Sequence, residues 1–336
     1  MMSSRGGSSA LPNSSHSRSI PLACALGMER ESTVQPMTVF GVHTGLQHTT
    51  TDELIELWRR IEAMGFDWIS IWDHFYAADL TGSPHCLEAV ATHAALACTT
   101  ERVRCGSLVY SVGYRHPAVL ANAIATIDQL SGGRADLGLG AGWSQIEYDA
   151  YGIEFPSTRV RLDQLEEAAA CVRSLLRDGS TTFAGEHFRM TDAQCDPRPV
   201  QEALPIWIGG GGERRTLRIA ARFADGWNVP FISPEDFARK RAVLHRHCDD
   251  VNRDPAEVRC AANVGLAWRE EDFEAQFGNM RMMVRPGVLT GSDAEVADRV
   301  GQYVDAGADQ VNVAIRAPFD ADGLARFTSA VGIASA

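Results

Sequence analysis

Short apolar runs alternate with amphipathic stretches from Thr38 to the end of the chain. Eight runs have the length and character of buried strands: Thr38–Val42, Asp67–Ile71, Val103–Val109, Ala135–Gly140, Leu204–Ile208, Gly226–Val229, Val258–Leu266 and Asp309–Ile315. Apolar residues at helical spacing occur between them, in Asp52–Met64, Pro117–Leu130, Thr158–Arg177, Glu213–Ala224, Pro234–Asp250, Asp293–Ala306 and Asp320–Val331. This alternation predicts an α/β fold built as a TIM (β/α)8 barrel. A doubly wound open sheet is the alternative, and the lack of an obvious dinucleotide fingerprint favours a closed barrel.

Three long segments interrupt this alternation, and we expect them to lie beside the active site as insertions. They are Ala141–Ser157, Asp178–Ala203 and Ala267–Gly291. The second segment predicts a small hairpin from Thr181–Phe183 to Phe188–Met190. The third is rich in Met and Arg, and with the first it could cover the site as a lid.

Composition narrows the class of protein and its partners. The 336 residues are 45% hydrophobic, which suffices for one large core, and no apolar run is long enough to cross a membrane. The net charge of −12 disfavours nucleic acid and anionic membranes. Eight cysteines lack metal-type spacing, which predicts reduced thiols, no metal site and a cytoplasmic location. Residues 1–37, rich in Ser, Gly and Pro, predict a disordered extension before a single domain over 38–336, with Met28 or Met37 as alternative starts.

The second predicted strand ends in a histidine flanked by a carboxylate. Asp73 and His74 follow Ile71 and Trp72, and barrel active sites lie at the carboxyl ends of the strands. A histidine there can exchange a proton near neutral pH, and Asp73 could tune it. A loop histidine bonded to backbone, beside a turn aspartate, is the structural alternative.

Glycines mark the ends of the third and fourth strands. Gly106 on the third permits a close backbone approach and is a candidate cofactor-binding residue, although from the residues alone a simple bend is the preferred explanation. The fourth runs into Gly138, Gly140 and Gly142 before Trp143, and this spacing leaves room for a flat ring. Glu147 and Tyr148 follow and could line the mouth of the site.

Four consecutive glycines follow the fifth strand. Gly209, Gly210, Gly211 and Gly212 lead into a predicted helix, where exposed amides can bind phosphate. Arg214, Arg215 and the hydroxyl of Thr216 could add donors. The spacing is neither a P-loop nor a dinucleotide fingerprint, and a flexible turn is the alternative.

These segments together resemble the luciferase-like flavin and deazaflavin oxidoreductases over nearly all of residues 38–331. The resemblance rests on Gly65-Phe66-Asp67, Trp72-Asp73-His74-Phe75, Tyr114-Arg115-His116-Pro117, Leu130 to Arg134, Leu139 to Trp143, Ile208 to Gly212 and Ala224 to Trp227. It implies a luciferase-like barrel with coenzyme F420 as cofactor, its ring at the strand ends near His74. It also implies a non-proline cis peptide at Leu108–Val109 behind the ring, and phosphate binding from Gly209 onward.

Two positions depart from the branch that oxidises a sugar phosphate. Ala78 stands where that branch has an aromatic residue, and Trp143 stands where it has a glutamate. Sugar-phosphate oxidation is therefore disfavoured, and we expect Trp143 to pack on the ring or the substrate.

The function expected from the resemblance is hydride transfer between F420 and a small organic substrate. His74 would handle the proton, with Asp73 and Glu147 as further catalytic residues. An FMN-dependent luciferase-like monooxygenase and a non-catalytic flavin- or deazaflavin-binding protein are the alternatives. Barrels of this kind often pair through their outer helices, so a homodimer is also expected.

Overall fold

Eight parallel strands close into a barrel in the computed structural model, which describes residues 38–335. In barrel order they are β1 (Val39–Thr44), β2 (Trp68–Ile71), β3 (Arg104–Ser107), β5 (Ala135–Gly140), β8 (Ile206–Gly209), β9 (Gly226–Pro230), β10 (Arg259–Leu266) and β12 (Gln310–Ile315). The barrel closes because β12 pairs with both β10 and β1. The predicted TIM barrel is thus confirmed. The disordered extension predicted for residues 1–37 lies outside the described residues.

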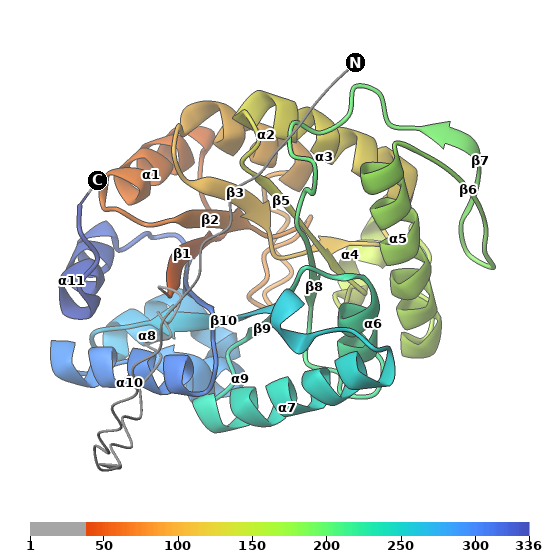
Figure 1. Ribbon diagram of the computed structural model, residues 1–336. Coiled ribbons are helices and arrows are strands. Elements are labelled where there is room, and N and C mark those ends of the chain that lie inside the picture. Colours follow the sequence, from red (N-terminus) through yellow and green to blue (C-terminus); the bar gives the residue numbers. More distant parts are fainter. Residues whose placement is uncertain (1–37, 336) are drawn as a thin grey trace, which may run out of the picture. The chain divides into compact units, whose positions relative to one another are not determined.

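Helices form an outer ring around the strands (Figure 1). Those that follow or separate the barrel strands are α1 (Thr51–Ala63), α2 (Ala89–Thr99), α3 (Pro117–Ser131), α5 (Thr158–Asp178), α6 (Thr216–Phe223), α7 (Pro234–Asp250), α10 (Asp293–Asp305) and α11 (Ala321–Val331). The sequence pattern missed α2, because its residues are nearly all apolar or alanine and show no polar face. It also placed the start of the first helix one residue late: α1 begins at Thr51 and not at Asp52, because Thr50 caps it in a capping box with Glu53.

The three insertions carry most of the remaining elements. The predicted hairpin is confirmed as β6 (Ser180–Ala184) and β7 (Arg189–Gln194), which lie outside α5 (Figure 1). The first insertion holds α4 (Gln145–Tyr151), and the third holds α8 (Glu270–Phe277) and α9 (Arg281–Val284). Two short strands, β4 (Tyr110–Ser111) and β11 (Val288–Leu289), extend the sheet, and short 3-10 turns span Pro255–Glu257, Gly278–Met280 and Arg285–Gly287.

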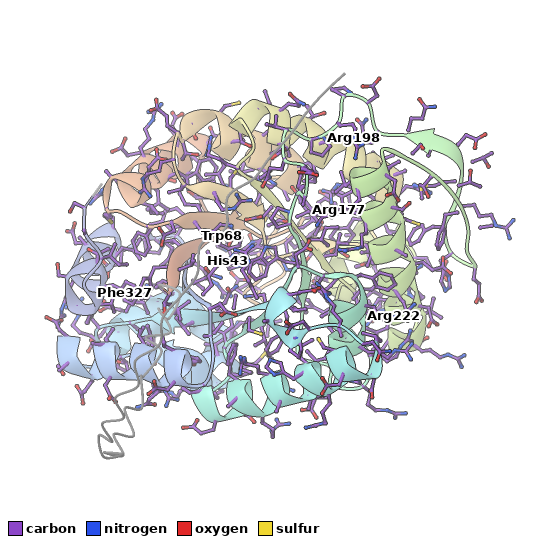
Figure 2. All side chains as sticks on the ribbon, in the orientation of Figure 1. His43, Trp68, Arg177, Arg198, Arg222 and Phe327 are labelled. Atoms are coloured by element: carbon purple, nitrogen blue, oxygen red, sulfur yellow. The ribbon has the colours of Figure 1, made fainter. Side chains whose placement is uncertain are left out.

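Two tryptophans fill the barrel interior. The rings of Trp68 and Trp207 lie 6.1 Å apart, and the indole of Trp68 donates a 2.6 Å hydrogen bond to Asp136. A Cβ on Gly106 would stand 2.4 Å from the Trp68 ring, and one on Gly226 would stand 2.3 Å from Trp207. Figure 2 shows Trp68 and His43 together in the middle of the barrel. This packed layer closes the interior, as is usual for such barrels.

No helix among residues 38–335 is long and apolar enough to span a membrane.

Candidate active site

A cavity of about 630 Å³ opens at the carboxyl ends of the barrel strands. Its size is typical of a site for a cofactor or small molecule. Ten of the residues singled out from the sequence are close to or part of its wall: Asp73, His74, Leu108, Val109, Gly140, Gly142, Trp143, Gly209, Gly210 and Thr216. Asp73 and Gly209, which are 136 positions apart in the sequence, therefore line the same cavity, as the strand order requires.

His74 and Glu147 form a hydrogen-bonded pair beside this cavity. His74 Nδ1 lies 2.7 Å from Glu147 Oε1, and no residue of the described range bonds the other ring nitrogen, Nε2. Glu147 sits in the first turn of α4, a buried position from which it cannot line the cavity itself. The pair couples the ring at the wall to a carboxylate behind it.

Two further donors hold the Glu147 carboxylate. Its Oε2 accepts hydrogen bonds of 2.8 Å from the Phe75 amide and 2.8 Å from the Tyr114 hydroxyl. Burial acts to raise the pKa of Glu147, but the hydrogen bond and charge of His74, with the Phe75 amide, lower it below its ordinary value. Burial and the charge of Glu147 raise the pKa of Tyr114, so this hydroxyl remains a donor. Glu147 therefore stays ionised and orients His74.

Trp143 stands at the rim of the cavity. Its side chain is 52% exposed, and its ring meets that of His74 edge-on with centroids 5.4 Å apart. A large aromatic ring that is half exposed to solvent and next to the cavity histidine is placed to contact a bound ligand.

Asp73 belongs to a buried ion pair. Its Oδ2 accepts hydrogen bonds from Arg115 Nη1 at 2.7 Å and from the Ser111 amide at 3.0 Å. Burial raises the pKa of Asp73, and Arg115 and Ser111 offset only part of that rise. The sequence grouped Asp73 with His74, but the structure directs its carboxylate to Arg115, and His74 takes its carboxylate from Glu147.

The floor of the cavity is backbone and one valine. The Leu108–Val109 peptide bond is cis, as the resemblance implied. A Cβ on Gly140 would stand 2.3 Å from Val109 Cγ2, and one on Gly209 would stand 2.6 Å from Val109 Cγ1. These two glycines are therefore needed for Val109 to lie between strands β5 and β8. Gly106, also predicted to bind the cofactor, lies below this floor against Trp68 and does not line the cavity.

Only part of the glycine run faces the cavity. Gly209 and Gly210 line it, and Gly210 has a φ of 117°, which side chains rarely adopt. Helix α6 begins at Thr216, three residues after the predicted start at Glu213, so a longer loop than predicted separates the glycines from the helix. Gly211, Gly212 and Arg214 lie outside the lining residues, and Arg214 is exposed without an ion pair in residues 38–335.

A lysine that the sequence did not single out lies beside this loop. Lys240 Nζ donates a 2.7 Å hydrogen bond to the Gly211 carbonyl and lies 3.1 Å from Glu213 Oε1. Lys240 lies in α7, and nothing in the sequence of that helix indicates that one of its side chains contacts the loop at Gly211. Lys240 supplies positive charge where Arg214 was expected to.

The sequence also missed four polar residues in the cavity wall. His43, Asn228, Asn263 and Arg316 interrupt or directly follow apolar strands β1, β9, β10 and β12. A polar residue near the carboxyl end of a barrel strand is itself a signal for a site, and it could have identified all four. The third insertion contributes Met280, Met283 and Val284 to the wall. No cluster of three or more His, Cys, Asp or Glu side chains within residues 38–335 could hold a metal ion.

The fold and this site define a class: a (β/α)8 barrel with a glycine-lined cavity and a histidine–carboxylate pair at its strand ends. The family model described as luciferase-like monooxygenase matches residues 34–286, and the chain belongs to this family.

A curated relative and two solved structures are also similar to this chain. The F420-dependent glucose-6-phosphate dehydrogenase of Amycolatopsis mediterranei (strain U-32) is 34% identical over 176 residues, 52% of each chain. The chain thus spans about half the length of the curated relatives it matches.

Both structures share the fold at low identity. An F420-dependent secondary alcohol dehydrogenase in complex with an F420-acetone adduct has a TM-score of 0.76 at 19% identity, covering 88% of this chain and 99% of that one. The FMN-bound oxygenating constituent of 3,6-diketocamphane monooxygenase from Pseudomonas putida has a TM-score of 0.69 at 16% identity, covering 88% and 98%.

Proposed function

We propose that the chain is an oxidoreductase that transfers a hydride between coenzyme F420 and a small organic substrate. The observation that carries this proposal is the cavity floor, where Val109 packs between Gly140 and Gly209 and these three residues line the cavity. The family supports it, as does the F420-dependent activity of the Amycolatopsis relative. When bound, F420 supplies the hydride chemistry at its central ring carbon.

The residues present fit such a group. Gly140, Gly142, Gly209 and Gly210 line the floor without side chains, and the loop before α6 offers backbone amides and the Thr216 hydroxyl to a phosphate. Lys240 holds this loop through Gly211 and adds charge nearby. The Trp143 ring at the rim would cover a ring placed against His74.

His74 would hold or move the proton that accompanies the hydride. With Nδ1–H donated to the ionised Glu147, Nε2 is the atom free to exchange a proton with a ligand in the cavity. Glu147 is a positioning residue in this scheme, since it touches His74 and not the cavity. Asp73 would act indirectly too, by fixing the Arg115 and Ser111 segment.

Titration of the purified protein with F420 and FMN in parallel, followed by fluorescence quenching, tests the proposal. Micromolar or tighter binding of F420 alone is the expected result. Binding of FMN alone would replace the proposal with an FMN-dependent monooxygenase, and oxygen uptake would then be measured. Binding of neither would remove the basis for both.

The non-catalytic alternative needs a separate variant. His74→Ala should retain F420 binding and lose turnover by about 10²–10⁴-fold, the usual contribution of a positioned proton donor. A carrier protein would have no turnover to lose.

We also propose a cytoplasmic location, supported by the seven free cysteines of the described range. Pairing of two copies through outer helices stays a prediction, which sedimentation of the purified chain would test.

A further inference from the structure

One arginine in the cavity wall is buried without a partner. Arg316 directly follows β12 and is 4% exposed. It makes no hydrogen bond or ion pair with any residue in the range 38–335, and its Nε and Nη1 atoms are enclosed and unsatisfied. Buried charges in proteins are normally paired, because an unpaired one loses several kcal/mol of hydration.

Aromatic rings hold this guanidinium in place. Its central carbon lies 5.3 Å from the centroid of the Trp72 ring and 5.1 Å from that of Phe277. Such contacts stabilise a cation by less than the hydration that it loses on burial. Burial lowers the pKa of Arg316 to about 10, so the side chain is still charged at neutral pH. The charge of Asp79 acts to raise this pKa, but no carboxylate of residues 38–335 lies within ion-pair distance of the guanidinium. The cluster is therefore arranged around a positive charge without an anion in contact.

The position of Arg316 places it with the two cavity histidines. Strands β12, β1 and β2 are consecutive neighbours in the barrel, and they carry Arg316, His43 and His74 at or just after their carboxyl ends. Strand β8, which leads into the glycine loop, is separated from β12 by two strands on one side and four on the other. The Arg316 wall is therefore a different part of the cavity from the floor assigned to the cofactor.

His43 adds a neutral donor or acceptor to this wall. Its Nδ1 lies 2.7 Å from the Ser70 hydroxyl. Burial, with the charges of Arg316 and His74, lowers the pKa of His43 to about 3. A neutral imidazole contributes hydrogen bonding and no second positive charge, so the wall offers one net cation.

We propose that Arg316 binds the carboxylate of a small monoanionic substrate, with His43 beside it and the reacting carbon toward His74. The part of this inference that concerns the reaction rests on the proposed function, whereas the carboxylate-binding site does not. A monoanion fits because Arg316 is the one arginine or lysine among the residues of the range 38–335 that line the cavity. Planar carboxylates match the guanidinium fork, and a phosphate dianion would call for a second cation.

The rest of this wall indicates the body of the substrate. Phe231, Ile232, Met280, Met283 and Val284 line the cavity and offer apolar surface. The substrate class is therefore an organic acid with an apolar body, not a polyhydroxylated sugar phosphate. Ala78, which lines the same cavity where a branch of the family has an aromatic residue, leaves additional room.

Calorimetric titration of the purified full chain with benzoate, benzamide and phenylphosphonate tests the proposal. Benzoate is expected to bind at least about tenfold more tightly than the neutral benzamide, as one charged hydrogen-bonded contact would give. Arg316→Met should lose that preference while keeping apolar contact with Trp72 and Phe277, and Arg316→Lys should keep part of it. Arg246→Met, at an exposed arginine in α7, is the matched control and should bind like the wild type.

Each other outcome contradicts the inference. Equal binding of benzoate and benzamide, or undiminished benzoate binding by Arg316→Met, would show that Arg316 does not hold the anion. Tighter binding of phenylphosphonate than of benzoate would replace the carboxylate with a phosphate. Thermal unfolding is run on every variant: Arg316→Met should be at least as stable as the wild type, since it removes an unpaired buried charge, and Arg316→Lys provides the comparison if it is not.

The test separates this inference from the proposed function. Benzoate binding is measured without cofactor and F420 binding without benzoate. If benzoate binds in a way that depends on Arg316 but F420 does not bind, the carboxylate site is supported and the proposed cofactor is not. F420 binding with no preference for benzoate would do the reverse.

Discussion

His74 Nδ1 and Glu147 Oε1 lie 2.7 Å apart, although 73 positions separate the two residues in the chain. His74 lies in the cavity wall just after β2, and Glu147 lies behind it in α4 of the first insertion. In the related branch, a glutamate is expected at the position of Trp143. Here the carboxylate comes from one helical turn further on, which leaves Trp143 free to face a ligand.

Replacing Glu147 with Gln should lower kcat by about 10–100-fold with little change in folding. The amide keeps the size of the side chain and can still accept from Phe75 or Tyr114, but it no longer stabilises a protonated His74. Steady-state rates across pH 5–9 would show the apparent pKa for turnover moving down in the variant. Tyr114→Phe, which removes one donor and leaves the charge, should change kcat only a few-fold. An unchanged pH profile in Glu147→Gln would contradict the coupling of the pair.

The sequence predicted the barrel well because its signal is local. Each parallel strand is covered on both faces and reads as an apolar run, and each outer helix except α2 shows one apolar stripe. The ends were less accurate where side-chain bonds decide them: Thr50 caps α1 because its hydroxyl reaches Glu53 N, a contact that Thr51 could equally have offered in sequence.

The site was predictable only in part, for a different reason. His74, Gly140 and Gly209 could be found because each sits at the end of a recognisable strand. Arg316 and His43 lie at such positions too, but one polar residue at the end of an apolar strand is a weak signal unless the residues that surround it in the fold are known. Lys240 could not be found, since its role depends on how α7 packs beside the loop of Gly211. Gly106 packs against Trp68 below the cavity floor, and the sequence alone does not show at which depth of the barrel a glycine lies.

Acid should destabilise the protein through His43. In the folded state its pKa is lowered to about 3 from 6.5, mainly by burial. Between these pH values the unfolded chain binds the extra proton, so the free energy of unfolding falls as pH drops from 6.5 toward 3. His43→Gln should flatten this fall by an amount on the order of a few kcal/mol, measured by urea unfolding at pH 7, 5 and 4. His85→Gln, at an exposed site, is the control and should leave the slope unchanged. A slope equal to that of the wild type in His43→Gln would show that His43 does not drive it.

Adding one carbon at Gly140 should damage the cavity floor. The new Cβ would stand 2.3 Å from Val109 Cγ2, so Gly140→Ala should cost about 1–3 kcal/mol of unfolding free energy and weaken F420 binding. Gly301→Ala is the control: nothing lies within 4 Å of a Cβ there, inside α10, and the change should stabilise by about 0.5–1 kcal/mol. Both free energies come from chemical denaturation.

The double variant Gly140→Ala/Val109→Ala isolates the cause of that effect. If the clash with the valine methyl groups is responsible, the double variant should recover part of the stability that Gly140→Ala loses, and the two effects should not add. If the losses of unfolding free energy in Gly140→Ala and Val109→Ala simply add, a clash with Val109 is not the cause of the effect.

Breaking the ion pair of Asp73 should affect stability more than catalysis. Arg115→Met leaves a buried carboxylate at Asp73 with only the Ser111 amide, and we expect a loss of about 3–5 kcal/mol in unfolding free energy. Asp73→Asn/Arg115→Met should recover much of this, because no charge is then left unpaired. Chemical denaturation of the wild type, Asp73→Asn, Arg115→Met and the double variant gives the cycle, and turnover of the folded variants gives the second readout. The opposite result would be that Asp73→Asn alone abolishes turnover at unchanged stability and unchanged F420 affinity. Asp73 would then handle a proton itself, and it would share the role assigned to His74 with Glu147.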